Sequence, residues 1–202
     1  MRIIAGEYRG RFLTTVRDHS VRPTTDRVKQ ALFDLLTHRI DFTESSVLDL
    51  FAGSGSLGLE ALSRGAHEVV FVEKSRSSIE VLESNIAALD CSARCTIYPA
   101  DVFWFLKNTH RSYDLVFVDP PYKLESIGTL PSAISASKVL KEGSYVIMEH
   151  SRESHVDVSP DSYEVMEKSF GQTRALILKA KPKASEHSGA LTGAGDSRGD
   201  HS

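Results

Sequence analysis

Apolar residues along the chain alternate between short continuous runs and stretches with helical spacing. The short runs are typical of strands buried in a parallel sheet, and they occur at residues 46–50, 69–72, 93–98, 113–118 and 145–148. Between them, helices are predicted over residues 57–64, which Gly65 ends, and after Ser75, where Ile79, Leu82, Ile86 and Leu89 share one face. Because strands and helices alternate, the sequence predicts an α/β fold with a mostly parallel sheet covered on both faces.

Three further segments complete this pattern. A helix is predicted after Arg22-Pro23, with an apolar stripe of Val28, Ala31, Leu32, Leu35 and Leu36. The runs 163–170 and 173–179 flank Gly171-Gln172 and predict an antiparallel hairpin that closes the sheet. Residues 124–140 are less regular, because Pro131 interrupts an otherwise helical pattern.

The length and composition fit one globular domain with short additions. The chain has 202 residues, of which 41% are hydrophobic and 25% charged, and this excludes a wholly disordered protein. We predict a basic N-terminal extension over residues 1–40 (a strand or hairpin plus a helix), a main domain over 41–182 and a disordered tail over 183–202. No apolar run approaches the roughly 18 residues that span a bilayer, and two cysteines are too few for a disulfide framework. We therefore expect a cytoplasmic protein with no membrane partner.

The charge is unevenly distributed. Residues 1–40 carry a net charge of +4 and the rest of the chain −7. This asymmetry indicates that the N-terminal segment meets a polyanion, although a solvated basic surface would give the same pattern.

A glycine-rich motif follows the first predicted strand. Gly53-Ser-Gly55-Ser-Leu-Gly58 precedes a predicted helix, and Glu73 follows twenty residues after Gly53, at the end of the second strand. Glycines permit a tight turn and the close approach of a ligand, and an acid at this position can accept hydrogen bonds from a ribose. The motif therefore predicts an adenosine-containing cofactor. It does not distinguish a dinucleotide, whose pyrophosphate would lie at the helix N-terminus, from S-adenosylmethionine.

Two other acids belong to the same predicted edge of the sheet. Asp49 lies within an apolar strand, where a carboxylate needs a partner, and it can accept from the ammonium of the cofactor. Asp101 follows the third strand, where it can either contact adenine or cap the helix that starts at Val102.

The tetrapeptide Asp119-Pro120-Pro121-Tyr122 ends the fourth strand. Two prolines stiffen the loop and remove two N–H groups, so that it presents acceptors without competing donors. Such a loop suits an amino group: Asp119 and the Pro120 carbonyl can accept its hydrogens, and Tyr122 can stack on a nucleobase. A Pro-Pro turn with an aspartate cap is the purely structural alternative.

Several of these motifs together resemble the bacterial 16S rRNA guanine-N2 methyltransferases. The resemblance rests on Arg2-Ile-Ile-Ala-Gly6, Arg9-Gly-Arg11, Arg22-Pro-Thr-Thr-Asp-Arg27, the stretches from Val47 to Gly55 and Gly58 to Gly65, and Asp119 to Tyr122, and it covers about residues 1–180. It implies a seven-stranded Rossmann-like methyltransferase domain over 41–182, S-adenosylmethionine as cofactor, and a guanine of 16S rRNA in the small ribosomal subunit as target. Lys74-Ser75 departs from the acidic residue that many relatives have after the ribose-binding acid.

The predicted site residues are assigned on this basis. The catalytic residues are Asp119, Pro120, Pro121 and Tyr122, and the cofactor-binding residues are Asp49, Phe51, Gly53, Gly55, Glu73, Lys74, Asp101 and Val102. The residues predicted to bind RNA phosphates are Arg9, Arg11, Arg22, Thr24 and Arg27, although Arg27 can equally pair with Asp26. Eight scattered histidines predict no metal site, and we expect a monomer.

Three alternatives explain part of the same sequence. A nicotinamide-dependent oxidoreductase shares the glycine motif and the acid but leaves Asp119 to Tyr122 unexplained. A DNA adenine-N6 methyltransferase accounts for that loop but usually has an added target-recognition region, for which this chain has no room. A non-catalytic factor that holds rRNA through the arginines predicts that Asp119 can be replaced without effect.

Overall fold

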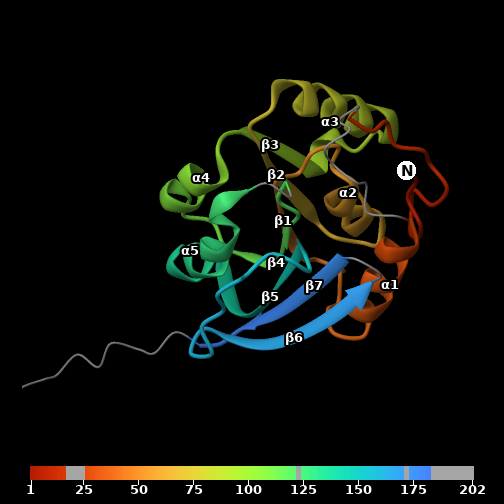
Figure 1. Ribbon diagram of the computed structural model, residues 1–202. Helices are drawn as coiled ribbons and strands as arrows, with labels where there is room; N and C mark the ends of the chain where they lie inside the picture. Colours follow the sequence, from red (N-terminus) through yellow and green to blue (C-terminus); the bar gives the residue numbers. More distant parts are fainter. Residues whose placement is uncertain (17–25, 122–123, 171–172, 183–202) are drawn as a thin grey trace, which may run out of the picture.

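The computed structural model describes residues 1–16, 26–121, 124–170 and 173–182. Among the predicted residues, Arg22, Thr24, Tyr122 and the tail 183–202 lie outside this part of the chain. Seven strands form one sheet with helices on both sides (Figure 1). The strands are β1 (Ser46–Leu50), β2 (Glu68–Glu73), β3 (Cys95–Pro99), β4 (Tyr113–Val118), β5 (Leu140–Ser151), β6 (Tyr163–Phe170) and β7 (Thr173–Ala180). The α-helices are α1 (Asp26–Thr37), α2 (Ser56–Ser63), α3 (Arg76–Leu89), α4 (Val102–Asn108) and α5 (Leu130–Ala136).

The sheet is parallel over five strands and antiparallel at its C-terminal end. The strand order is β3-β2-β1-β4-β5-β7-β6, and β7 is antiparallel to both β5 and β6. The predicted α/β fold, a mostly parallel sheet with an antiparallel C-terminal hairpin, is thus confirmed. In this topology the carboxyl ends of β1, β2, β3, β4 and β5 meet at one edge, where ligands of doubly wound folds bind.

Each face of the sheet has its own hydrophobic core. Figure 1 shows α1, α2 and α3 on one side of the sheet, and α4 and α5 on the other. Alternate residues of β1 serve the two cores, since Val47 packs on the first face and Leu48 on the second, and both are fully buried. Burying an aliphatic side chain of this size contributes about 1.5–3 kcal/mol, so the two cores position the strand ends firmly.

The N-terminal segment, residues 1–16, packs on the face that carries α2. Arg2 and Phe12 form an antiparallel bridge, and the Ile3 amide donates to the Arg11 carbonyl over 2.9 Å. Ile3, Tyr8 and Leu13 belong to the same core as α1, α2 and α3. Gly6, with φ of +82°, lies so close to α2 that a β-carbon would be 1.7 Å from the Ser63 oxygen. The segment is therefore continuous with the core of the main domain.

The buried face of α1 differs from the predicted stripe. Leu32 and Leu36 are fully buried as predicted, but Lys29 and Phe33 complete the buried face, whereas Val28, Ala31 and Leu35 are only partly buried. The cause is Glu60 of α2, whose carboxylate lies 3.2 Å from the Lys29 ammonium with both side chains fully buried. An ion pair thus replaces apolar residues on this face.

Three other predicted boundaries differ from the structure. Ser92–Arg94 form a 3-10 turn, so β3 begins at Cys95 rather than at residue 93. Pro131 does not interrupt a helix but lies in the first turn of α5, where its missing N–H is not needed. Finally, β5 extends well beyond residues 145–148, from Leu140 to Ser151. In the part of the chain that is described, no helix is both long and apolar enough to cross a membrane.

Candidate cofactor and active site

A cavity of about 480 Å³ lies at the carboxyl ends of the parallel strands. Most of the predicted site residues line it together, and they come from the ends of β1, β2 and β4, the loop after β1 and the start of α4: Asp49, Phe51, Gly53, Glu73, Lys74, Val102, Asp119, Pro120 and Pro121. Gly55 and Asp101 are not part of its wall. The sheet thus gathers residues up to 72 positions apart in the sequence around one space.

The glycine loop is built for close approach of a ligand at one position and for packing at two others. Gly53 has φ of +55°, and the nearest atom to a β-carbon there would be the Phe51 oxygen, 4.0 Å away. Its backbone therefore borders open space. Gly55 and Gly58 face inward instead: a β-carbon at Gly55 would lie 2.3 Å from Leu82 Cδ1, and one at Gly58 2.4 Å from Phe71 Cε1. These two glycines hold α2 close to β2 and α3.

Phe51 has backbone strain next to this loop. Its φ of +60° is a left-handed conformation that a bulky residue rarely adopts. The residue lines the cavity between Leu50 and the glycine turn. Such strain is typical of residues that the surrounding structure holds in place at binding sites.

The carboxylate of Glu73 fastens the glycine loop to the turn after β2. One oxygen accepts from the Gly53 amide over 2.9 Å, and the other accepts from the Lys74 and Ser75 amides over 2.9 and 2.8 Å. Two carboxylate oxygens provide about four acceptor positions, so this carboxylate retains capacity for a further donor. Glu73 therefore shapes the cavity in addition to its predicted contact with ribose.

Asp49 is almost fully buried beneath the same loop. Its Oδ2 accepts from the Gly58 amide over 2.9 Å, which satisfies part of the buried carboxylate. Burial raises the pKa of Asp49 well above its usual value, the Gly58 hydrogen bond opposes this, and the negative charges of Asp119 and Glu73 raise the pKa further. A cationic ligand group in the cavity would lower this pKa by favouring the ionised form of Asp49.

Asp119 lies at the end of β4, on the strand next to Asp49. Its side chain has no hydrogen-bond partner within the described ranges, and burial raises its pKa to about 6. A carboxyl group in this state is poised to change protonation near neutral pH. It can accept a hydrogen bond or a proton from a ligand that enters the cavity.

The proline loop after Asp119 is fixed at both ends. The Asp119 amide lies 3.5 Å from the Leu50 oxygen, and the Pro121 carbonyl accepts from the Leu124 amide over 2.9 Å. Pro120 is buried and Pro121 is exposed, and both line the cavity. The loop thus borders the same cavity as the glycine turn.

Asp101 acts as the helix cap that the sequence left as one of two alternatives. Its Oδ1 accepts from the Phe103 amide over 2.9 Å and from the Trp104 amide over 3.4 Å, at the N-terminus of α4. Its other oxygen lies 3.4 Å from the Lys74 ammonium. Ala100 and Val102, on either side of it, line the cavity. Contact between Asp101 and adenine stays a prediction.

Sequence reasoning missed one wall of the cavity. Met1, Thr15 and Val16 of the N-terminal segment line it together with the glycine loop. The only sequence signal was indirect, namely Lys29 within an apolar helix and Glu60 within the apolar α2. These two buried charged groups form an ion pair, which also binds backbone groups of the N-terminal segment.

The predicted RNA-binding arginines that are described lie on the surface. Arg9 and Arg27 are exposed, and the exposed guanidinium of Arg11 donates to the Ala88 carbonyl at the end of α3. Asp26 pairs with Arg2 at 3.3 Å, so Arg2 rather than Arg27 is its partner. Phosphate contact stays a prediction for all of them.

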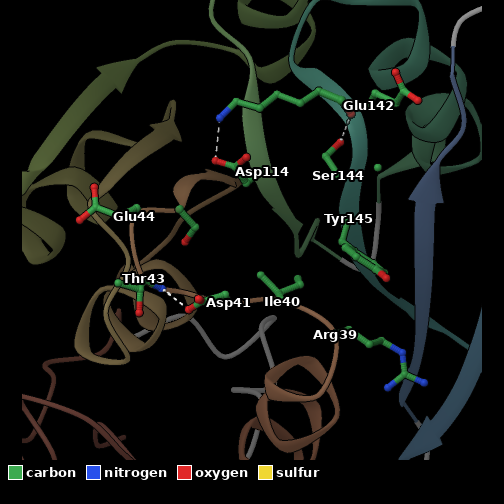
Figure 2. Close-up of a pocket in the computed structure, with 12 residues that line it drawn as sticks. Arg39, Ile40, Asp41, Thr43, Glu44, Asp114, Glu142, Ser144 and Tyr145 are labelled. Carbon is green, nitrogen blue, oxygen red and sulfur yellow. Dashed lines mark hydrogen bonds and ion pairs between the residues drawn. The ribbon is translucent and has the colours of Figure 1, made fainter.

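A second cavity, of about 340 Å³, lies at the opposite edge of the sheet (Figure 2). It is bordered by the starts of β1, β4 and β5, and none of the predicted site residues lies there. Its Lys141 ammonium is 2.7 Å from Asp114, which also accepts from the Ser46 amide over 2.8 Å. The charge and the hydrogen-bonding groups of Lys141, Asp114 and Ser46 thus have partners within the protein. Within residues 1–16, 26–121, 124–170 and 173–182, no three His, Cys, Asp or Glu side chains form a metal-binding group.

The sheet is parallel except for its C-terminal part, where one antiparallel strand is inserted, and a glycine loop and acidic strand ends surround one cavity. Together these features define a methyltransferase of the Rossmann-like class that uses S-adenosylmethionine. The family model described as Conserved hypothetical protein 95 matches residues 1–179. The chain belongs to this family, which includes the ribosomal RNA small subunit methyltransferases D.

Relatives match over nearly the whole chain. YlbH of Bacillus subtilis is 34% identical over 90% of this chain and 100% of its own length. The ribosomal RNA small subunit methyltransferase D of Haemophilus influenzae is 35% identical over 85% of this chain and 89% of its own. The solved structure of Escherichia coli yhhF superposes with a TM-score of 0.80 at 30% identity, covering 91% of this chain and 99% of that one. Because these relatives are methyltransferases, the alternatives of a nicotinamide-dependent oxidoreductase and of a non-catalytic rRNA-binding factor are no longer supported.

The cavity fits S-adenosylmethionine chemically. The open space at Gly53 admits a ligand against the backbone, and the buried Asp49 carboxyl is an acceptor whose ionised form a cationic amino acid portion would favour. Glu73 and Lys74 lie at the end of β2, where the ribose-binding acid of this class is found. S-adenosylmethionine is therefore the cofactor of this chain, and its contacts with Asp49, Gly53 and Glu73 stay a prediction.

Proposed function

We propose that this methyltransferase modifies the exocyclic N2 of a guanine in 16S rRNA of the small ribosomal subunit. The observation that carries the proposal is the position of Asp119 and Pro120 at the border of the cofactor cavity. The names of the relatives from Haemophilus influenzae and Escherichia coli support small-subunit rRNA as the substrate. The exposed Arg9, Arg11 and Arg27 support an RNA partner as well.

Acceptor groups favour an amino nitrogen as the target. The Asp119 carboxylate and the Pro120 carbonyl accept the two amino hydrogens, and Tyr122 stacks on the flipped base. Accepting both hydrogens favours the pyramidal nitrogen, whose lone pair is no longer delocalised into the ring. When bound, S-adenosylmethionine supplies an electrophilic methyl group on its sulfonium. The role of the protein is to align the amino nitrogen with this methyl group and to exclude competing water.

The raised pKa of Asp119 supports a second role in the same reaction. A methylated amino group carries an additional proton that must leave. A carboxylate whose pKa is raised to about 6 takes up that proton more readily than an ordinary aspartate does. Asp119 then returns the proton to water as the product dissociates.

The substrate is a structured RNA, in keeping with the names of the small-subunit rRNA methyltransferases among the relatives. RNA recognition of this kind relies on shape and on unpaired bases that can be splayed out. We propose an assembled or partly assembled small subunit as the partner, and a monomeric enzyme in the cytoplasm.

The test is to identify the methylated base. The purified protein is mixed with radiolabelled S-adenosylmethionine and, in parallel, with small subunits that lack the modification, the corresponding bare 16S rRNA, and genomic DNA. We expect label in N2-methylguanine of the small subunits. Label in N6-methyladenine of DNA would instead support a DNA methyltransferase, and label in another nucleotide of the rRNA would overturn the guanine-N2 assignment.

A further inference from the structure

Asn85, on α3, connects two separate segments of the chain through its side chain. It is 2% exposed, and its Oδ1 accepts from the Thr14 amide over 2.9 Å. Its Nδ2 donates to the Thr14 carbonyl over 3.0 Å and to the Ser54 carbonyl over 2.9 Å. Both amide hydrogens and one acceptor position are thus used, and all three partners are backbone groups.

The two segments that Asn85 joins are both walls of the cofactor cavity. Ser54 lies between Gly53 and Gly55 and lines the cavity. Thr14 is followed by Thr15 and Val16, which line it from the N-terminal segment. One buried amide therefore fixes the relative position of the glycine loop and the N-terminal segment.

A second polar connection runs in parallel through Lys29. Its ammonium donates to the Arg2 carbonyl over 2.7 Å and to Ser56 Oγ over 3.3 Å, and Ser56 begins α2 and also lines the cavity. The paired Glu60 carboxylate accepts from the Ile4 amide over 2.8 Å and from the Ala5 amide over 3.1 Å. The N-terminal segment is thus attached to the elements of the cofactor site at both of its ends.

We infer that Asn85 is a positioning residue for cofactor binding: it couples the docking of residues 1–16 to the conformation of the glycine loop, so that each stabilises the other. A ligand that holds the glycine loop in place then also holds the N-terminal segment, by linkage. The inference concerns the cofactor alone. Its extension to RNA, in which a docked segment presents Arg9 and Arg11, rests on the function proposed above.

Removing the Asn85 amide leaves two partly buried carbonyls and one amide without their partner. We expect the affinity for the cofactor to fall, because binding must then also order the glycine loop, which the Asn85 side chain no longer holds. The loss of such contacts corresponds to about tenfold in affinity. Turnover at saturating cofactor should change little, since Asn85 does not line the cavity itself.

Calorimetry and hydrogen exchange with S-adenosylhomocysteine, without RNA, provide the test. In the unmodified protein we expect the ligand to slow exchange of the Ile3 and Leu13 amides, which hold the segment together through the Arg11 and Met1 carbonyls. In Asn85→Ala we expect about tenfold weaker binding and loss of this protection. Asn108→Ala is the matched control, because Asn108 also donates to a backbone carbonyl, that of Trp104, but within α4.

Each outcome decides the inference independently of the substrate. If the ligand leaves exchange of Ile3 and Leu13 unchanged in the unmodified protein, the coupling does not exist, and this measurement requires no variant. Equal affinity and intact protection in Asn85→Ala would also overturn it. Should Asn85→Ala fail to fold, Asn85→Asp keeps the Thr14 amide contact while removing both donors, and the same two readouts apply. A raised KM for the cofactor with unchanged kcat would separate positioning from general damage.

Discussion

Asp49 and Asp119 face one cavity from neighbouring parallel strands, and the charge of Asp119 is one of the causes that raise the pKa of Asp49. Two carboxyl groups in a poorly solvated space disfavour each other's ionised form. These two carboxyl groups therefore hold their protons more readily than ordinary aspartates do. A bound cofactor with cationic groups would favour their ionised form.

Activity should fall as the pH decreases through about 6. The pKa of Asp119 is raised to about 6, so the ionised form that accepts the amino hydrogens is lost below that pH. We expect kcat/KM to rise with pH and to reach half of its plateau near pH 6, since kcat/KM reports groups of the free enzyme. A profile that stays flat from about pH 5 to 8 would contradict the proposed role of Asp119.

Asp119→Asn should stabilise the protein near neutral pH while greatly lowering its turnover. An acid whose folded pKa is raised loses stability as the pH rises from its ordinary value of 3.8 to about 6, because the folded state releases its proton less readily. At pH 7 the amide removes this penalty, on the order of 3 kcal/mol, and the gain should largely vanish near pH 4. Thermal melts at the two pH values check this. A melting temperature that is lower than that of the unmodified protein at pH 7 would count against it.

Gly58→Ala should destabilise the fold through overpacking. The new β-carbon would lie 2.4 Å from Phe71 Cε1 and 2.8 Å from Val69 Cγ1. Overpacking of this kind costs about 1–3 kcal/mol, and it should appear as a lower melting temperature. The double variant with Phe71→Leu removes the closest atom and should recover part of the loss. If the single variant melts like the unmodified protein, α2 does not pack on β2 as described.

Arg9→Ala should weaken RNA binding and lower its salt dependence. Arg9 is exposed and has no charged partner in the described parts of the chain, so its guanidinium is available to a phosphate. We expect the slope of log K against log salt to decrease by about 1. Arg76→Ala is the matched control, since Arg76 is 94% exposed on α3 and pairs with Glu80. Equal slopes for both variants and the unmodified protein would exclude phosphate contact at Arg9.

The sheet and the site around Asp49, Glu73 and Asp119 could be predicted because their signals are local. A buried strand is a run of apolar residues, and the carboxyl ends of parallel strands must meet at one edge, so acids at these ends converge. The chemistry of the strand ends thus follows from the order of residues and one topological rule.

The N-terminal wall of the cavity could not be predicted in this way. Its contacts join residues far apart in sequence, such as Ile4 with Glu60 and Thr14 with Asn85, and most of them use backbone amides and carbonyls. Backbone groups are the same in every residue, so such contacts leave no pattern in the sequence. The fully buried Lys29 could not be predicted either, because its partner Glu60 lies on another helix and the sequence does not say that the two side chains meet.

The position of the first residue has a practical consequence for work with this enzyme. Met1 lines the cavity, and its carbonyl accepts from the Leu13 amide over 2.9 Å. An affinity tag joined before Met1 would begin at the wall of the cofactor cavity, where we expect it to interfere with ligand binding. Because β7 runs antiparallel to β5, a tag attached after the end of β7 would begin at the other edge of the sheet, which makes it the better choice for titrations and crystal soaking.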